Sequence, residues 1–177
     1  SRLASEGQSP KILFITCGDS RVEPGVITAT RPGDLFTIRN IGNLIPCCDG
    51  EGADCCRGED VSVTAALEFT LDVLRIESIV ICGHSECGAM KALLEGKPMA
   101  AQPHLDQWLR LARPTLDRYL ESGPPEEGMA AHDHLSRLNV IQQLEHLRRH
   151  PKVRARMAEG TLQIHGWFFD IRNADVY

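Results

Sequence analysis

Long hydrophobic runs are absent from this sequence of 177 residues. No apolar stretch approaches the roughly 20 residues that a membrane-spanning helix needs, so no membrane insertion is expected. Aromatic residues are scarce, at 5%, and the formal net charge is −5, with no basic stripe that carries interleaved aromatics. Nucleic acid is therefore not an expected partner. No signal peptide is recognisable either.

The sequence also lacks the cysteine pattern of a small secreted protein. Its seven cysteines are an odd number, and a chain of this length can bury enough apolar surface to fold without disulfide bridges. These features favour a reducing compartment, and hence the cytoplasm, with cysteines that bind metal or remain thiols. We expect one domain over residues 1–177, of which the N-terminal helical arm and the C-terminal end can be incomplete.

Four of the cysteines lie within ten residues, in the segment CCDGEGADCC at 47–56. The vicinal pairs Cys47-Cys48 and Cys55-Cys56 do not match the C-x2-C spacing of zinc knuckles, and the acidic centre lacks the calcium-loop pattern. Loop thiols are the favoured interpretation, with a second metal or a Cys48–Cys55 disulfide left open. The segment connects the stretch that contains Phe36 and Ile41 to the stretch that contains Phe69. A further hypothesis is that oxidation of the segment alters access to a pocket near these residues, which is described below.

Short apolar runs rich in β-branched residues alternate with stretches of helical periodicity. Residues 17–34, rich in glycine, proline and charge, are expected to be mostly loop. Alternating strands and helices imply an α/β fold, a single domain with a mostly parallel central β-sheet flanked by helices. The strands are expected at 11–16, 34–40, 78–82 and 161–171, and the helices near 62–75, 85–96, 104–121, 133–149 and after Pro151.

Two of the expected strands end in residues that can bind a metal. Cys17 follows KILFIT, and His84 follows SIVIC with Cys87 three residues later, in the expected first turn of a helix. Adjacent parallel strands would bring the three together, and a helix N-terminus favours a thiolate. Two thiolates and one imidazole suit zinc and leave a fourth position open, as in catalytic sites. The alternative for each cysteine is a small buried hydrophobic residue.

A carboxylate and a guanidinium flank Ser20 in the turn after Cys17. Asp19 could occupy the fourth metal position and close the site. Alternatively, a bidentate pair with Arg21 would hold Asp19 back, and the carboxylate would then accept a hydrogen bond from a metal-bound hydroxide. An ordinary loop ion pair is the third interpretation.

Together these motifs resemble the β-class carbonic anhydrases, in their plant-type branch. The resemblance implies reversible hydration of carbon dioxide to bicarbonate and a proton, with one Zn²⁺ per chain on Cys17, His84 and Cys87. It also implies that Asp19 and Arg21 act as a gating pair and that the chain forms a homodimer or higher oligomer. The stretches that carry it, in chain order, are CGDSRVEP, PGDLFTIRNIGNLIP, VTAALEFTLDVL, IVICGHSECGAMKALL and NVIQQLEHLRRHPKVRARMAEGTLQIHGWFFDI.

The resemblance further implies a set of substrate contacts. Gln8, in GQSP, matches a glutamine typical of the plant-type branch, and Phe36 and Ile41 match apolar pocket residues. Phe69 stands where that branch has a tyrosine, so a role for its hydroxyl is excluded. The backbone N–H of Gly88 is a further polar contact. Family pockets draw on two subunits, so the glutamine and both phenylalanines are expected to serve the neighbouring subunit's zinc.

Two departures from the family pattern stand close to these motifs. Gly18 replaces the usual serine or alanine, and the loop IPCCDGEGADCCRGED replaces a shorter glycine loop.

Two alternative functions remain open. The resemblance extends to carbonyl sulfide and carbon disulfide hydrolases on the same scaffold, and the domain could instead be a catalytically silent zinc-binding regulatory module.

Overall fold

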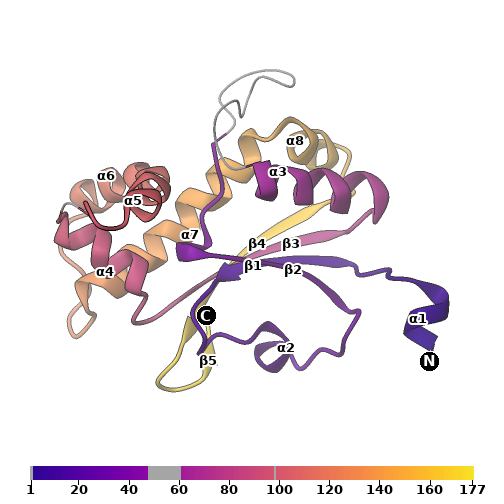
Figure 1. The fold of residues 1–177 in the computed structure, drawn as a ribbon, viewed down its shortest axis with the longest axis horizontal. Coiled ribbons are helices and arrows are strands. Elements are labelled where there is room, and N and C mark those ends of the chain that lie inside the picture. Colours follow the sequence, from indigo (N-terminus) through magenta and orange to yellow (C-terminus); the bar gives the residue numbers. More distant parts are fainter. Residues whose placement is uncertain (1, 48–60, 98) are drawn as a thin grey trace.

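A five-stranded β-sheet forms the centre of the computed structural model, which describes residues 2–47, 61–97 and 99–177 (Figure 1). Its order is β2-β1-β3-β4-β5, in which the first four strands run parallel and β5 runs antiparallel to β4. The predicted mostly parallel α/β sheet is thus confirmed. The strands are β1 (Ile12–Cys17), β2 (Leu35–Asn40), β3 (Ser78–His84), β4 (Gln163–Asp170) and β5 (Asp175–Val176).

One or more helices lie between each pair of successive parallel strands, and short helical turns join several of them. The helices are α1 (Arg2–Glu6), α2 (Pro24–Ile27), α3 (Val61–Glu68), α4 (Gly88–Glu95), α5 (Pro103–Leu109), α6 (Arg113–Glu121), α7 (Ala131–Arg149) and α8 (Pro151–Ala158). The turns are η1 (Ile41–Asn43), η3 (Phe69–Val73) and η4 (Arg110–Ala112). None of the described helices is long and apolar enough to cross a membrane.

The central strands are continuous apolar runs in the sequence because side chains on both of their faces are buried. Successive side chains of a strand point to opposite faces of the sheet. Leu13 and Ile15 join the core on one face, whereas Phe14 packs with Val80 and Cys82 on the other. Helices α3, α7 and α8 lie over the first face, and α2 with the C-terminal hairpin lies on the second (Figure 1). Both faces of the central strands are therefore buried, as in most parallel sheets.

The strand register decides which residues meet at the carboxyl edge of the sheet. In β1, Cys17 pairs with Asn40 of β2, and Thr16 pairs with Cys82 of β3. His84 lies two residues beyond Cys82, so it lies at the same edge as Cys17. The adjacency of β1 and β3, on which the predicted site depends, is therefore present.

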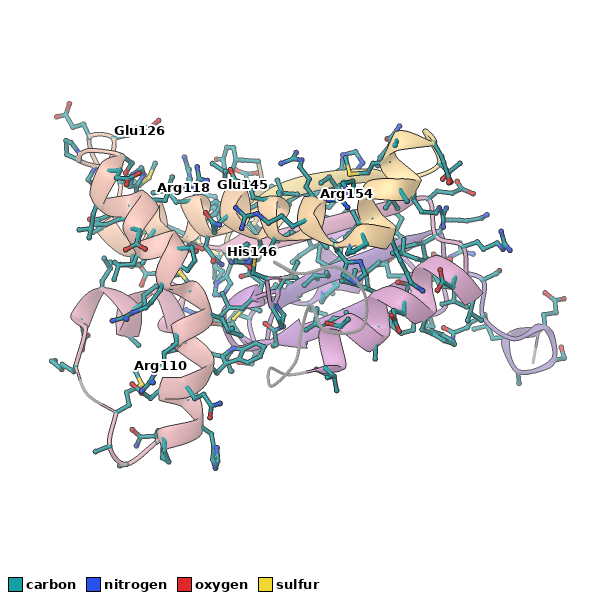
Figure 2. All side chains as sticks on the ribbon, turned by 90° about the horizontal axis from the view of Figure 1, so that it is seen from above. Arg110, Arg118, Glu126, Glu145, His146 and Arg154 are labelled. Atoms are coloured by element: carbon teal, nitrogen blue, oxygen red, sulfur yellow. The ribbon has the colours of Figure 1, made fainter. Side chains whose placement is uncertain are left out.

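Two glycines allow the long helix α7 to lie directly on the sheet. A Cβ atom at Gly83 would lie 2.7 Å from Val140 Cγ2, and one at Gly166 would lie 2.8 Å from Val140 Cγ1. Such distances exclude any larger residue without a shift of the helix. Ser136 of α7 consequently reaches the end of β3. On the side of α7 toward α6, Arg118 donates to Glu145 over 2.6 Å, and both side chains are labelled in the view from above (Figure 2).

Some local expectations are met only in part. The stretch 17–34 is mostly loop, as expected, apart from the short helix α2, which Pro24 starts from its first position, where its missing N–H is not needed. The expected helix near 62–75 ends in the π-helical turn η3, and the helix near 104–121 is divided by η4. Of the clustered cysteines, Cys48, Cys55 and Cys56 lie outside the described residues. Cys47 is described, and its Sγ lies 3.5 Å from Arg149 Nη1.

Candidate metal centre

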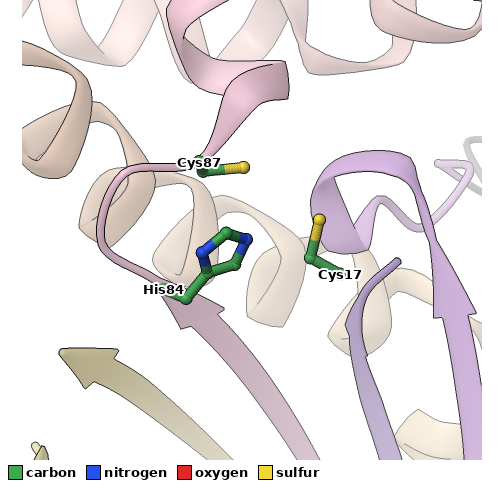
Figure 3. A group of neighbouring side chains, drawn as sticks. All are labelled: Cys17, His84 and Cys87. Atoms are coloured by element: carbon green, nitrogen blue, oxygen red, sulfur yellow. The ribbon is translucent and has the colours of Figure 1, made fainter. Parts of the chain in front are cut away.

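Three potential metal ligands converge at the carboxyl edge of the sheet (Figure 3). Cys17 ends β1, His84 ends β3, and Cys87 closes the turn that leads into α4. Their ligand atoms all lie within 4.8 Å of one another, and all three residues are buried. Residues distant in sequence thus form one compact group of two sulfurs and one imidazole.

The hydrogen bonding of His84 leaves one ring nitrogen available to a metal. Its Nδ1 lies 2.8 Å from the carbonyl oxygen of Ser85, so Nδ1 carries the proton and donates it. Its Nε2 is buried and has no hydrogen-bond partner among the described residues. A buried nitrogen without a partner is unfavourable in a protein interior, whereas a metal ion would accept its lone pair. The imidazole therefore fits a metal ligand.

The two thiols influence each other because they share one small volume. A hydrogen bond from Cys87 is the largest of several contacts that lower the pKa of Cys17, against the opposing effect of burial. The same interaction, together with burial, raises the pKa of Cys87. A divalent cation between the sulfurs would offset the second negative charge and favour two thiolates. The donor set therefore fits a metal that prefers sulfur and nitrogen ligands.

The sequence spacing predicted Cys87 in the first turn of a helix. In the structure Cys87 is instead the N-cap of α4, directly before its first turn. The backbone N–H groups of Ala89 and Met90 still favour its thiolate, although burial and Cys17 outweigh them. The helix terminus thus acts on this sulfur in the expected direction but does not decide its pKa alone.

Arg21 binds both carboxylate oxygens of Asp19. Its Nε donates to Oδ1 over 2.9 Å and its Nη2 to Oδ2 over 2.7 Å, while the backbone N–H of Arg21 donates to Oδ1 over 3.0 Å. The guanidinium holds the pKa of Asp19 well below its usual range. The bidentate arrangement proposed from the sequence is present, and it turns the carboxylate toward Arg21.

Sequence reasoning missed the residues that hold the two ligand loops from outside. Arg39 Nη2 donates to the carbonyl oxygen of Asp19 over 2.7 Å, and its Nε donates to that of Cys17 over 3.3 Å. Ser136 Oγ of α7 donates to the carbonyl oxygen of His84 over 2.8 Å. Arg39 could have been noticed as a charge at a strand end, whereas nothing in the sequence pattern marks Ser136.

The turn between His84 and Cys87 is held on both sides. Glu86 lies in it with a φ of 59°, a left-handed conformation that is unfavourable for a non-glycine residue. Its N–H donates to Asp133 Oδ1 over 2.6 Å, and its carbonyl oxygen accepts Arg21 Nη2 over 3.2 Å. Asp133, which the sequence analysis also missed, therefore helps to fix the approach of Cys87.

The predicted pocket residues divide into a near and a far group. Ile41 lies beside the site, since a Cβ atom at Gly18 would be 3.7 Å from its Cδ1, and Gly88 is the exposed first residue of α4. The rings of Phe36 and Phe69 lie 5.9 Å apart, but Phe36 pairs with Leu13, four residues before Cys17.

Gln8 is also distant from the metal ligands within this chain. It precedes β1 and lines a groove at the amino ends of the strands, opposite the edge that carries Cys17. The single chain thus brings Ile41 and Gly88 to the site but leaves Gln8, Phe36 and Phe69 away from it.

Comparison with known proteins identifies the family once this geometry is in place. The sequence profile of the carbonic anhydrase family matches residues 12–176. A β-carbonic anhydrase, CcaA, has a structure that superposes with a TM-score of 0.85 at 36% identity, over 99% of this chain and 75% of that one. The chain belongs to the β-carbonic anhydrase family.

Relatives within the family are similar over almost the whole chain. A carbonic anhydrase from Synechococcus elongatus is 39% identical over 97% of this chain, and one from Pseudomonas aeruginosa is 41% identical over 96%. The chain covers 61% of the first protein and 73% of the second. It therefore spans less than two thirds of the Synechococcus elongatus protein.

Two further structures bear on assembly and on the alternative activity. Tetrameric β-carbonic anhydrases from Sordaria macrospora include a structure that matches with a TM-score of 0.82 at 31% identity, over 98% of this chain and 82% of that one. A carbon disulfide hydrolase matches with a TM-score of 0.59 at 14% identity, over 99% of this chain and 82% of that one, which shows a shared fold only.

Proposed function

We propose that this chain catalyses the reversible hydration of carbon dioxide to bicarbonate and a proton. The observation that carries the proposal is the buried group of Cys17, His84 and Cys87. Nε2 of His84, which has no hydrogen-bond partner in the described part of the chain, is directed at the two sulfurs (Figure 3). Membership of the β-carbonic anhydrase family supports the same reaction. A cytoplasmic location is part of the proposal, because the thiol ligands need a reducing environment.

We further propose zinc as the metal, held by these three residues. Zinc binds readily to two thiolates and an imidazole, and when bound it lowers the pKa of a water molecule so that a nucleophile forms. Asp19, fixed by Arg21, would accept a hydrogen bond from the attacking water and orient it toward the substrate carbon. The same hydrogen bonds from Arg21 would keep the Asp19 carboxylate from binding the metal.

The substrate pocket is proposed to form between two subunits of a homodimer or higher oligomer. Ile41 is 47% exposed beside the site, and Phe69 is 38% exposed away from it, so each has apolar surface available to a partner. Gln8 and Phe36 would complete the neighbouring pocket, as in the plant-type branch, and the N–H of Gly88 would contact substrate. The tetrameric relatives from Sordaria macrospora support such an assembly.

A hydration assay combined with metal analysis tests the proposal. Purified protein under reducing conditions should contain one zinc per chain and hydrate carbon dioxide, and the Cys17→Ala variant should lose both. Cys82→Ala is a matched control, because Cys82 is also buried but lies in the core on the other face of the sheet. Wild-type protein that neither binds zinc nor hydrates carbon dioxide would contradict the proposal.

The alternatives are separated by the same protein preparation. Faster turnover of carbonyl sulfide or carbon disulfide than of carbon dioxide would favour the hydrolase activity. Stoichiometric zinc without turnover of any of these substrates, in reducing and alkaline buffer, would favour a silent regulatory module.

A further inference from the structure

One peptide group beside the metal ligands is hydrogen-bonded at both ends. The N–H of Gly42 donates to Cys17 Sγ over 3.4 Å. The carbonyl oxygen of Ile41, in the same peptide group, accepts the indole N–H of Trp108 over 2.7 Å. The indole of α5, the peptide and the cysteine sulfur therefore form one continuous chain of hydrogen bonds.

Hydrogen bonds in such a chain strengthen one another. A donor to a peptide oxygen draws electron density toward that oxygen and makes the N–H at the other end a better donor, by about 10–30% per bond. Here the better donor points at a sulfur that would bind the metal. Outer hydrogen bonds to metal ligands commonly determine how tightly a metal is held.

We propose that Trp108 is a positioning residue of the metal centre, which acts through the Ile41–Gly42 peptide on the sulfur of Cys17. The inference rests on the proposed metal site and names a residue that helps to determine its affinity. Trp108 packs against the core cluster that contains Cys17 and Cys87, and its indole N–H orients and polarises the peptide that donates to Cys17.

A second set of contacts fixes the same segment independently of Trp108. Asn139 of α7, fully buried, donates from Nδ2 to the carbonyl oxygen of Gly42 over 2.9 Å. Its Oδ1 accepts Thr115 Oγ1 over 3.0 Å and Gln143 Nε2 over 2.9 Å. Asn40 binds Leu44 through both its side-chain atoms, at 2.8 and 2.9 Å. The backbone should therefore stay in place when only the indole N–H is removed.

The test compares the same substitution at the two tryptophans of the chain. Trp108→Phe removes the N–H donor and keeps an aromatic ring. Trp167→Phe is the matched control, because Trp167 packs edge-on against Phe14 on the other side of the sheet. The full chain is loaded with Zn²⁺ for competition with a chelator and with Co²⁺ for absorption spectra, and the metal-free protein is unfolded in urea.

We expect Trp108→Phe to weaken metal binding roughly three- to tenfold, at or below the lower limit for outer hydrogen bonds to metal ligands, because Trp108 acts through an intervening peptide. The thiolate-to-Co²⁺ absorption band should move to longer wavelength, because a weaker hydrogen bond leaves the sulfur electrons less stabilised. The urea midpoint of the metal-free protein should change no more than in Trp167→Phe. Trp167→Phe should alter neither affinity nor band.

Unchanged affinity and an unchanged Co²⁺ band in folded Trp108→Phe would overturn the inference, as would a loss of stability that accounts for the whole change. A wild-type chain that binds no metal would instead refute the proposed function. A second measurement covers the case in which Trp108→Phe does not fold. In wild-type protein loaded with ¹¹³Cd, the Gly42 amide proton should show a coupling to cadmium through the sulfur, and its absence would overturn the inference.

Discussion

Gly42 offers a sharp test of how tightly the fold and the metal centre depend on each other. Its φ is 78°, in the left-handed region, and a Cβ atom there would lie 3.1 Å from Ala89 Cβ and 3.4 Å from Met90 Cε. Ala89 belongs to the first turn of α4, so it can move only with the helix that follows Cys87. An alanine at Gly42 therefore adds both backbone strain and crowding beside a metal ligand.

The magnitude follows from these two terms. A left-handed alanine costs about 1–2 kcal/mol, of which the reduced entropy of the unfolded chain offsets about 0.4–1 kcal/mol. Crowding in a packed site adds about 1–3 kcal/mol. Gly42→Ala should thus lower the free energy of unfolding of the metal-free protein by about 1–5 kcal/mol. It should also weaken metal binding, because relief of the contact moves the Gly42 N–H away from Cys17 Sγ.

Gly96→Ala is the matched control. Gly96 has a φ of 59°, also left-handed, but a Cβ atom there would meet nothing within 4 Å. The control should therefore show only the net backbone strain, up to about 1.6 kcal/mol, with unchanged metal affinity. Urea unfolding and chelator competition measure the two quantities. Equal losses of stability in both variants, or unaltered metal affinity in Gly42→Ala, would refute the reasoning.

Three further predictions concern charge. Arg21→Ala should abolish hydration while zinc stays bound, because Asp19 keeps only the backbone N–H as a partner and can turn to the metal; metal analysis showing lost zinc would instead indicate a structural role for the arginine. Hydration kcat/KM should rise into alkaline pH, because two thiolates offset the zinc charge, and a flat, full-activity profile from pH 6 upward would contradict this. Burial lowers the pKa of His150 below its ordinary 6.5, so the unfolded chain takes up a proton at a higher pH than the native state does. The free energy of unfolding should therefore fall as the pH drops below about 6.5. His150→Gln should flatten this dependence in urea unfolding at pH 8 and pH 5.5, whereas an unchanged slope would assign it to other groups.

The parts of the site that follow strand ends were predictable from sequence, because parallel pairing constrains them strongly. Once KILFIT and SIVIC are recognised as neighbouring buried strands, Cys17 and His84 must lie at one edge. The spacing also predicts that Asp19 and Arg21 share one turn. Their bidentate contact is one of three interpretations that the sequence leaves open, and only the three-dimensional structure distinguishes it from the other two.

Contacts made by the later helices could not be predicted in the same way. Trp108 and Asn139 reach the Ile41–Gly42 segment across 67 and 97 residues of sequence, and no local pattern distinguishes them from ordinary helix residues. The positions expected for the substrate pocket show another limit, because Phe36 and Phe69 lie away from Cys17, His84 and Cys87 of the same chain. Sequence periodicity describes elements and leaves their mutual placement open.

The close approach of α7 to the sheet connects the residues at the strand ends with the contacts that the later helices make. Gly83 stands one residue before His84, and its missing side chain lets Val140 come within 2.7 Å of the position where a Cβ atom would be. At that distance Ser136 reaches the carbonyl oxygen of His84, and Asn139 reaches that of Gly42. One helix therefore fixes both the strand that carries His84 and the residue, Gly42, whose N–H donates to Cys17. A shift of α7 should therefore disturb His84 and Cys17, two of the three proposed metal ligands, together.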